Sequence, residues 1–530
     1  MQSEAECLRI LEREWASTCR TVLGGEIGPM EEFSEWLSGL NDPLVMRQGA
    51  VMTSNNYCEG AMVQRMGRID FMKKFEPLSI NEMKDIDSLL EAVAERAFFC
   101  GNIVIGNSKF VESSSEVSDS FYVYKSVRIS GCKNVAHSQW MRLSENIFGT
   151  NEGGDTKFCL RCGIVYRNQR SFEIWICGNT SDSYYSYGLE DCSDCIFCFN
   201  LIGKSRSIGN LQLSGDKYAE LKKKLLAELR SELVKNKALP SLIEIVNQGR
   251  ADYSEALSAI KGLTYAPRDF DNSKLEEAFT STSSVVLGAP LKEIDSYAGW
   301  LSRHTIVPRD SMSVLSKTEL RVSDYPAMKE LPGNRLVTQE EALVLGEKLK
   351  APESLALSPS LSNASGILEK IAYFPPERRL GNYKNLVACQ WGSESNDCYR
   401  TVVASHDKLC GYNAWPRSSE NIFGSGIVYH SGFCFKCFDG VELKRCFEVD
   451  SARGCSDTWF SHNVEGMKNS LFCFNTKSKR YAVCNAEIGK EQFDEVKKMV
   501  QEWVISELQE RKTVPVSVYD IACGRKIRAD

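Results

Sequence analysis

The sequence predicts an α+β protein made by tandem duplication, in which each half is a helical segment followed by a parallel β-solenoid (β-helix-like) block and a closing amphipathic helix. The first observation is repetition: Phe197–Asn200 reappears as Phe472–Asn475, and Ser144–Gly149 as Ser419–Gly424, both at the same offset along the chain. The second is a cysteine- and asparagine-rich phrase that recurs at multiples of six residues. The third is an apolar stripe at helical spacing that ends each copy. Such repeats decide the architecture before any local pattern does.

The duplication also suggests domain bounds. Upstream of the blocks, Phe33–Ser38 matches Tyr297–Ser302 at a slightly shorter offset, and insertions in connecting loops would produce this drift. We expect six regions: 1–100, an N-terminal helical region; 101–213, the first solenoid block; 214–240, its closing helix; 241–382, the helical region of the second copy; 383–487, the second solenoid block; and 488–530, the second closing helix with a C-terminal tail.

Capping signals and apolar stripes predict the helices. Ser79 with Glu82 and Thr338 with Glu341 read as capping boxes, in which a hydroxyl and a carboxylate satisfy the first free amides of a helix. Behind the first box, apolar residues recur at helical spacing: Met83, Ile86, Leu90, Val93 and Ala97. The two closing helices carry equivalent stripes: Tyr218, Leu221, Leu225, Leu229 and Leu233, and Phe493, Val496, Val500, Val504 and Leu508. Lys222 to Lys224 lie largely off the stripe, so we expect a solvated face there.

Within each block the repeated phrase is a small residue, any residue, Asn or Asp, and a small or branched residue, as in Cys132–Val135. The starts of successive phrases are all separated by multiples of six, and the second copy keeps the same spacing as the first. Six residues make a short strand with its corner at about 3.3 Å per strand residue, and stacked coils of such strands would form a parallel solenoid. Small side chains would fill a thin interior, and Asn and Asp would take left-handed corners. A two-layer antiparallel sheet with coincidental spacing is the alternative.

The end of each block resembles a known group. Asp191–Leu201, followed after an interval by a capped helix with Lys217 and Tyr218, resembles the ending of uncharacterised Cys/Asn-rich repeat proteins of bacterial and phage genomes. Lys479–Asn485 with Gly489–Phe493 is similar to the same ending, so two tandem copies would be present. The resemblance implies no activity. This chain lacks the evident N-terminal zinc ribbon, so the resemblance implies no metal binding either.

The composition is that of an ordinary globular protein, 43% hydrophobic and 25% charged, and 530 residues exceed what one core would normally hold. A formal charge of −6 argues against a general nucleic-acid coat. Because the chain has no long apolar run and starts without a secretory signal pattern, we expect it in the cytoplasm or in a particle assembled there. In that compartment the 21 cysteines would mostly be reduced thiols or metal ligands.

Cysteines are the only candidate metal ligands. Cys159-x2-Cys162 with Cys192-x2-Cys195 has zinc-like spacing, but Met467 replaces the third thiol in the other copy. The thiols that persist in both copies are Cys159, Cys162, Cys198, Cys434, Cys437 and Cys473. Three thiols with an unidentified fourth ligand could hold zinc in each half. Other cysteines exchange with Ser, Ala, Thr and Val between the copies, which indicates structural thiols in small buried slots.

Catalytic chemistry has little support in the sequence, and no catalytic residue or cofactor is predicted. Of five histidines, His137 and His462 are replaced by Tyr412 and Tyr187 in the opposite copy, so a shared histidine base is not expected. Solenoids of the pectate-lyase kind cut polysaccharides with clustered carboxylates. The duplicated candidates here are Asp182/Asp457, Glu173/Glu448 and Glu190/Glu465. Surface or corner positions would explain these carboxylates more simply.

Aromatic residues suggest binding instead. Trp140, Trp415, Tyr184 and Trp459 are large for strands with small interior slots, so they would either face a partner or pack under the helices. We therefore expect a non-enzymatic structural or interaction protein, a duplicated scaffold that binds other proteins or its own copies within a larger assembly such as a virion. A carbohydrate-active β-helix enzyme and a zinc-stabilised nucleic-acid-binding module are the alternatives. No membrane partner and no general nucleic-acid partner is expected.

Overall fold

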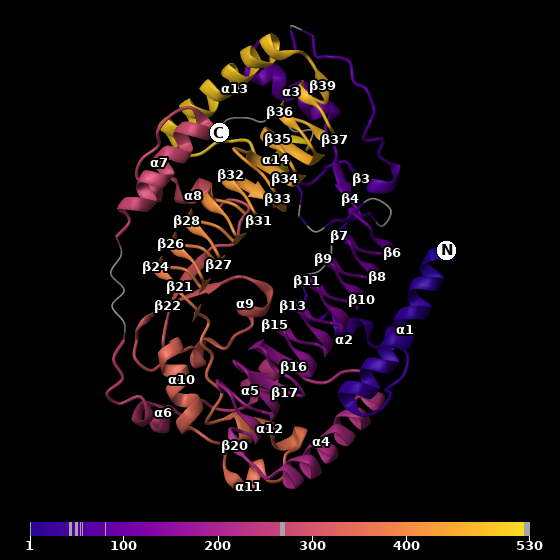
Figure 1. The fold of residues 1–530 in the computed structure, drawn as a ribbon, viewed down its shortest axis with the longest axis vertical. Helices are drawn as coiled ribbons and strands as arrows, with labels where there is room; N and C mark the ends of the chain where they lie inside the picture. Colours follow the sequence, from indigo (N-terminus) through magenta and orange to yellow (C-terminus); the bar gives the residue numbers. More distant parts are fainter. Residues whose placement is uncertain are drawn as a thin grey trace.

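The computed structural model describes residues 2–41, 45–47, 51–53, 55, 57–79, 81–265 and 271–523. Two large, predominantly parallel sheets dominate it: block 1, between Val104 and Gln212, and block 2, between Arg378 and Glu487. In Figure 1 block 1 (magenta) runs down the page and block 2 (orange) runs up beside it, with helices around the outside. Each block follows a helical segment and precedes a long helix. The fold is a duplicated α+β arrangement of two solenoid-like halves.

The strands are short and regularly spaced. In block 1 they are β5 (Val104–Ile105), β6 (Lys109–Glu112), β7 (Ser115–Ser118), β8 (Phe121–Tyr124), β9 (Val127–Ser130), β10 (Lys133–Ala136), β11 (Gln139–Arg142), β12 (Glu145–Phe148), β13 (Asn151–Gly154), β14 (Lys157–Leu160), β15 (Gly163–Tyr166), β16 (Gln169–Gly178), β17 (Tyr184–Tyr187), β18 (Ser193–Ile196), β19 (Ser205–Ile208) and β20 (Leu211–Gln212). In block 2 they are β23 (Arg378–Leu380), β24 (Lys384–Val387), β25 (Trp391–Ser393), β26 (Asn396–Tyr399), β27 (Val403–Ser405), β28 (Lys408–Gly411), β29 (Trp415–Arg417), β30 (Glu420–Phe423), β31 (Ile427–Tyr429), β32 (Gly432–Phe438), β33 (Gly440–Val441), β34 (Phe447–Arg453), β35 (Ser456–Glu465), β36 (Lys468–Leu471), β37 (Phe474–Lys477), β38 (Arg480–Val483) and β39 (Ala486–Glu487). Among the described residues, three further pairs lie outside the blocks: β1 (Val45–Arg47) with β2 (Val51–Thr53), β3 (Val63–Arg65) with β4 (Phe99–Gly101), and β21 (Pro308–Met312) with β22 (Glu319–Ser323).

One coil of each block consists of two strands and their two turns. Lys133 pairs in parallel with Glu145 on one side and with Phe121 on the other, and the next strand, β11, pairs with β9 and β13 in the same way. Six residues therefore make one strand and its turn, as the repeated phrase predicted. Only the last strand of each block, β20 and β39, pairs antiparallel with its neighbour.

The backbone has a finer period than the sequence suggested. A left-handed residue occurs at every third position from Phe110 to Gly209. The Asn and Asp residues of the repeated phrase do take these positions, as Asn134 (φ 57°) and Asp182 (φ 52°) do. Large residues such as Trp140 take them as well, so the repeated bend is a property of the coil and is not restricted to Asn and Asp. In block 2 the ladder of Trp391, Val403, Trp415 and Ile427 lacks the left-handed conformation.

The thin interior satisfies its own backbone. Ser126 N donates to Ser114 Oγ (3.0 Å), Ser138 N to Ser126 Oγ (3.1 Å) and Thr150 N to Ser138 Oγ (3.1 Å), one coil apart each time. Each serine hydroxyl in turn donates to the carbonyl two residues before it, as Ser138 Oγ does to Ala136 O (2.9 Å). A small side chain with a donor and an acceptor therefore suits the interior slots on this ladder, because buried amides need partners. This explains the preference for Ser, Thr and Cys.

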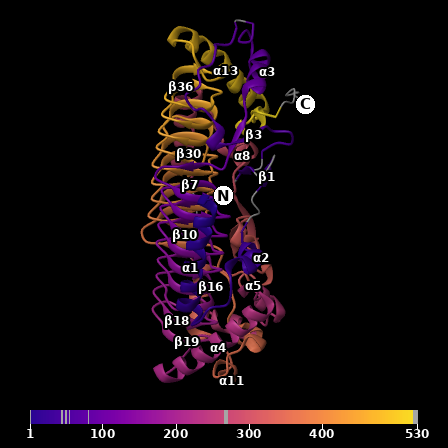
Figure 2. The same ribbon diagram turned by 90° about the vertical axis from the view of Figure 1, so that its right-hand side faces the viewer.

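Helices surround the blocks. They are α1 (Gln2–Leu23), α2 (Ser34–Ser38), α3 (Ile86–Arg96), α4 (Gly215–Asn236), α5 (Leu242–Gln248), α6 (Ser254–Ala259), α7 (Ser273–Leu287), α8 (Ala298–Ser302), α9 (Pro326–Lys329), α10 (Gln339–Lys348), α11 (Glu353–Ala356), α12 (Ala364–Leu368), α13 (Lys490–Arg511) and α14 (Val518–Ile521). In Figure 2 the strands of the two blocks lie on one side of the molecule and α2, α3, α5 and α8 on the other. All five stripe residues of α4 and all five of α13 are buried, so these helices close their blocks as the stripes predicted.

Two local expectations need correction. Ser79 and Glu82 do exchange the hydrogen bonds of a capping box, but they form a turn, and α3 starts only at Ile86 with Asp85 as its N-cap. Thr338 and Glu341 cap α10 as predicted. Lys222 is half-buried, and its Nζ lies 2.9 Å from Asp194 Oδ1, whereas the next two lysines are exposed.

The duplicated hexapeptide Ser144–Gly149 owes its identity in the two copies to packing. Ile147 fills the coil interior, while Phe148 faces outward and meets Trp15 of α1 edge-on, with ring centroids 5.3 Å apart. Gly149 has φ 66°, and a Cβ there would lie 2.8 Å from Leu37 O. Its counterpart Gly424 has φ 64°, and a Cβ there would lie 2.9 Å from Leu301 O. Only glycine allows the short helices to approach so closely.

Each half caps the block of the other half. Asn200 Nδ2 in block 1 donates to Tyr373 O (2.8 Å), and its counterpart Asn475 Nδ2 in block 2 donates to Phe98 O (2.7 Å). The two acceptors are themselves separated along the chain by the same offset as the two asparagines. The residues that follow the two acceptors repeat this relation: Phe374 packs against Phe199, and Phe99 packs against Phe474. Reciprocal contacts between equivalent residues define a pseudo-twofold relation between the halves.

Candidate functional site

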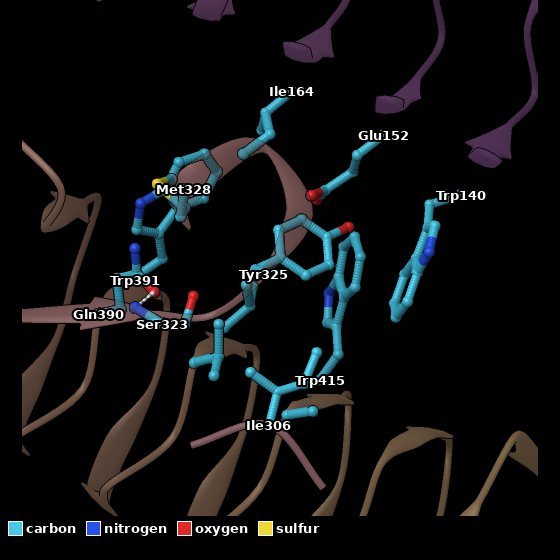
Figure 3. A pocket seen from close by; sticks show the side chains of 13 residues that line it. Trp140, Glu152, Ile164, Ile306, Ser323, Tyr325, Met328, Gln390, Trp391 and Trp415 are labelled. Carbon is cyan, nitrogen blue, oxygen red and sulfur yellow. Dashed lines mark hydrogen bonds between the residues drawn. The ribbon is translucent and has the colours of Figure 1, made fainter. Parts of the chain in front are cut away.

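The two tryptophans predicted to bind a partner instead bind each other. Trp140 and Trp415 occupy equivalent positions, and their rings stack with centroids 5.5 Å apart at an interplanar angle of 15°. Tyr325 meets Trp140 edge-on at 5.1 Å, and Figure 3 shows it beside the stacked pair. A residue that contacts its own counterpart lies at the pseudo-twofold axis. Trp415 is 7% exposed and Trp140 is half-buried, so the pair joins the blocks, and both rings also line the cavity described next.

A groove with a volume of about 600 Å³ opens beside this stack. Block 2 supplies a ladder of side chains one coil apart: Arg417, Tyr429, Val441, Arg453, Glu465 and Lys477. Block 1 supplies Ser118, Ser130 and Arg142, and apolar residues such as Met66 and Ile103 complete the wall. We call this the central groove. The ladder spans five coils, about 24 Å at about 4.8 Å per coil.

One groove cation is fully neutralised. Arg128 Nε lies 3.0 Å from Glu116 Oε2 of its own block, and Arg128 Nη2 lies 3.0 Å from Asp439 Oδ2 of the other block. Its guanidinium also covers the ring of Trp140 at 4.7 Å. This cluster fastens the blocks together and occupies two of the groove's carboxylates.

Two other arginines face the groove differently. Arg142 and Arg417 are equivalent residues of the two blocks, and each follows a tryptophan of the stacked pair by two positions. Both are half-buried, and within the described ranges neither forms an ion pair. We call them the arginine pair. Two cations of like charge thus line one cavity from opposite blocks.

Behind the arginine pair lies a buried carboxylic acid. Glu152 is 1% exposed and accepts a hydrogen bond from Tyr166 Oη at 2.6 Å. Burial raises the pKa of Glu152 to about 7, and Tyr166, Tyr325 and Arg417 offset part of that shift. Burial thus favours the neutral form of this acid.

The structure does not bring the candidate zinc ligands together. Cys162 and Cys198 lie on one interior ladder, three coils apart, which is about 14 Å and far beyond the reach of Zn–S bonds of about 2.3 Å. Cys437 and Cys473 have the same separation, while Cys159 and Cys434 sit one slot away in their blocks. Among the residues described, no group of three or more His, Cys, Asp or Glu is placed to hold a metal.

These thiols occupy the place that hydroxyls take in other coils. Cys198 Sγ donates to Ile196 O and Cys437 Sγ to Phe435 O, both at 3.3 Å and both to the carbonyl two residues earlier. Burial raises the pKa of the Cys437 thiol well above its usual value. Cys58 and Cys523 form a disulfide outside the blocks, so the expectation of reduced thiols does not hold for this pair. The other 19 described cysteines are free and buried.

Two of the predicted carboxylates, Glu173 and Glu448, belong to a buried cluster of a carboxylate, a cation and a helix end that occurs in both halves. Glu173 Oε1 lies 2.9 Å from Arg161 Nε, and Glu173 Oε2 accepts from the first amide of α5, Leu242 N, at 3.3 Å. In the other half Glu448 lies 3.7 Å from Lys436 Nζ and accepts from Val518 N, the first amide of α14, at 2.8 Å. The positive end of each helix thus docks on a carboxylate.

The cation of each cluster also donates a hydrogen bond to a backbone carbonyl. Lys436 Nζ donates to Trp300 O at 2.9 Å, and Arg161 donates to Trp36 O, the equivalent carbonyl. Burial lowers the pKa of Lys436 to about 8. Sequence reasoning missed this arrangement because Arg and Lys replace each other at the cation, although Trp36/Trp300 and Glu173/Glu448 were both recognised as equivalent pairs.

The remaining carboxylate candidates are dispersed. Asp182 pairs with Arg170 at 2.6 Å, and Asp457 lies 3.9 Å from Arg445. Glu190 pairs with Arg378 and helps to join the halves, whereas Glu465 lines the central groove. The duplicated carboxylate candidates therefore do not converge on one point.

The other aromatic candidates are core residues. Tyr184 is 2% exposed and donates to Val22 O at 2.8 Å under α1, and Trp459 is 1% exposed in the core of block 2. Neither ring is accessible to a partner in this structure. Packing beneath the helices, the alternative noted from sequence, accounts for both.

A buried histidine–aspartate pair looks catalytic but is not arranged for catalysis. His462 Nδ1 lies 2.9 Å from Asp450 Oδ2, and His462 Nε2 accepts from Cys100 N at 2.8 Å. Tyr57 Oη donates to the same aspartate at 3.0 Å. Because the second ring nitrogen is occupied by a backbone amide, no acceptor is left for a substrate proton. The pair fixes β4 on block 2.

The molecule is thus defined as a pseudo-twofold protein of two interlocked solenoid-like blocks with a groove between them. Comparison of the chain with protein-family models, with curated proteins and with solved structures found no match. In the described parts of the chain, no helix combines the length and the apolar character needed to cross a membrane.

Proposed function

We propose that the protein is a non-enzymatic interaction scaffold that works within a larger assembly, as two β-solenoids locked into one stiff frame, and holds its partner in the central groove. The observation that supports this most directly is the groove itself, because it is lined by both blocks and exists only through their association. Its open part carries exposed Ser130, Arg453 and Glu465.

The buried polar pairs favour a frame over an enzyme. Arg161 with Glu173, Lys436 with Glu448, and His462 with Asp450 all bind backbone or helix ends inside the protein. A cytoplasmic location, or a particle assembled there, fits this proposal.

The test is co-purification from the native source with one groove-filling variant. Ser130→Trp places an indole at the exposed groove wall, where it should displace a bound partner. Lys133→Trp is the matched control, because Lys133 is exposed three residues later in the same coil and does not line the groove. A partner retained by wild type and control but lost by Ser130→Trp supports the proposal. Equal retention by all three, or a lone monomer at every concentration, contradicts it.

A further inference from the structure

The arginine pair identifies the chemistry of the groove's occupant. Arg142 and Arg417 are related by the same pseudo-twofold axis that passes near the stacked tryptophans, so they approach the cavity from opposite blocks. Two cations in one partly buried site repel each other, and a guanidinium desolvated without an anion is costly. The protein nevertheless places both there.

The neighbouring acids do not neutralise this charge. Glu116 and Asp439 are both bound to Arg128. Asp119 Oδ1 accepts from Asn107 N at 2.9 Å and lies about two coils from Arg142. Glu465 lines the groove four coils from Arg417, next to Arg453. Glu152 is held behind Tyr166. An anion that enters the groove therefore meets two guanidinium groups whose carboxylate partners are missing.

Stacking on the tryptophans is not available to this anion. Trp140 is covered by Trp415 on one face, and Arg128 lies over its ring. Recognition then falls to hydrogen bonds, and a guanidinium binds oxyanions through two parallel N–H groups. A cavity of about 600 Å³ suits a ligand or ligand group of small-molecule size.

We infer that the central groove is an oxyanion-binding site in which Arg142 and Arg417 clamp one phosphate or carboxylate group at the pseudo-twofold axis. This inference rests on the proposed function, in which the groove holds a partner. The oxyanion that contacts the arginine pair belongs either to that partner or to a free small molecule.

The experiment is calorimetric titration of the full-length protein with pyrophosphate and, separately, with citrate, with chloride of equal ionic strength as reference. We expect binding with a Kd below about 1 mM for at least one of the two anions. The tighter anion identifies the phosphate or the carboxylate source. Arg142→Met combined with Arg417→Met should raise that Kd about tenfold or more, since hydrogen bonds to charged groups contribute strongly.

Lys477→Met is the matched control, because it removes a groove cation at the far end of the ladder and should leave the Kd within about twofold. Arg142→Lys and Arg417→Lys test whether a loss of binding comes from misfolding, because they keep the charge but lose the bidentate geometry. They should weaken binding by less than the double methionine variant. No binding beyond the chloride reference, or equal binding by the double methionine variant, overturns the inference. If anions fail to bind while Ser130→Trp still loses its partner, only the inference falls. If anions bind but no partner is lost, only the proposed function falls.

Discussion

Replacing Asp407 by serine should remove a large pH dependence of stability. Asp407 lies in the interior of block 2 with 2% exposure, where its counterpart in block 1 is Cys132. Its two carboxyl oxygens accept from Ser405 N (2.7 Å) and Ser419 N (2.9 Å), so it fills a slot that serine fills in the adjoining coils. Burial raises the pKa of Asp407 to about 8, against the lowering effect of these amides.

The sign follows from that shift. The unfolded carboxyl loses its proton near its ordinary pKa of about 3.9, whereas the folded carboxyl keeps its proton until about pH 8. The folded state is therefore fully favoured only below pH 4, and stability falls as pH rises from about 4 to 8. Each unit of pKa shift corresponds to about 1.4 kcal/mol, so the full range amounts to about 6 kcal/mol.

The assay is urea unfolding of wild type and Asp407→Ser at each pH from 5 to 9. The free energy of unfolding of wild type minus that of the variant should fall by about 1.4 kcal/mol per pH unit and level off above pH 8. As a control, Cys132→Asp should introduce the same slope in block 1. A difference that does not change with pH would refute the reasoning, because the carboxyl would then not lie in a dry coil interior.

Three further outcomes are expected. Gly149→Ala should lower the free energy of unfolding by about 2 kcal/mol or more, measured in urea, because its Cβ would lie 2.8 Å from Leu37 O at a left-handed φ; a change under about 0.5 kcal/mol would speak against that contact. The affinity for the tighter-binding of pyrophosphate and citrate should fall more steeply in wild type than in Glu152→Gln as pH rises through 7, since Glu152 then gains a charge near Arg417. Identical pH profiles of the two proteins in calorimetry would exclude Glu152. Cys162→Ser should change Tm by less than about 4 °C, and EDTA should not change Tm. A lower Tm in the presence of EDTA would indicate that the protein binds a metal.

The solenoid-like halves could be predicted because the coil imposes a local rule on every residue. Interior slots such as those of Cys132 and Ser144 favour small side chains, and left-handed positions such as that of Asn146 favour residues that tolerate this backbone. The closing helices could also be predicted, because each carries one apolar stripe. Helix starts were harder to predict, because Ser79 and Glu82 exchange the hydrogen bonds of a capping box without starting a helix.

The site was harder to predict, because it depends on how the halves meet. Nothing in the sequence near Trp140 tells whether the ring faces a partner, a helix or its own counterpart. The arginine pair is hidden in the sequence for the same reason, because only the pseudo-twofold association of the blocks places Arg142 and Arg417 in one cavity. Their equal positions relative to Trp140 and Trp415 were the available signal.

The groove depends on the reciprocal contacts between the two halves, and cutting the chain between the halves tests these contacts most directly. Gly262 is exposed, and a Cβ there would meet no atom within 4 Å, so a protease site can be inserted at this turn. After cleavage under reducing conditions, which open the Cys58–Cys523 disulfide, light scattering should still give one particle near 59.5 kDa. Two separate folded fragments, each with its own smaller mass, would contradict the account.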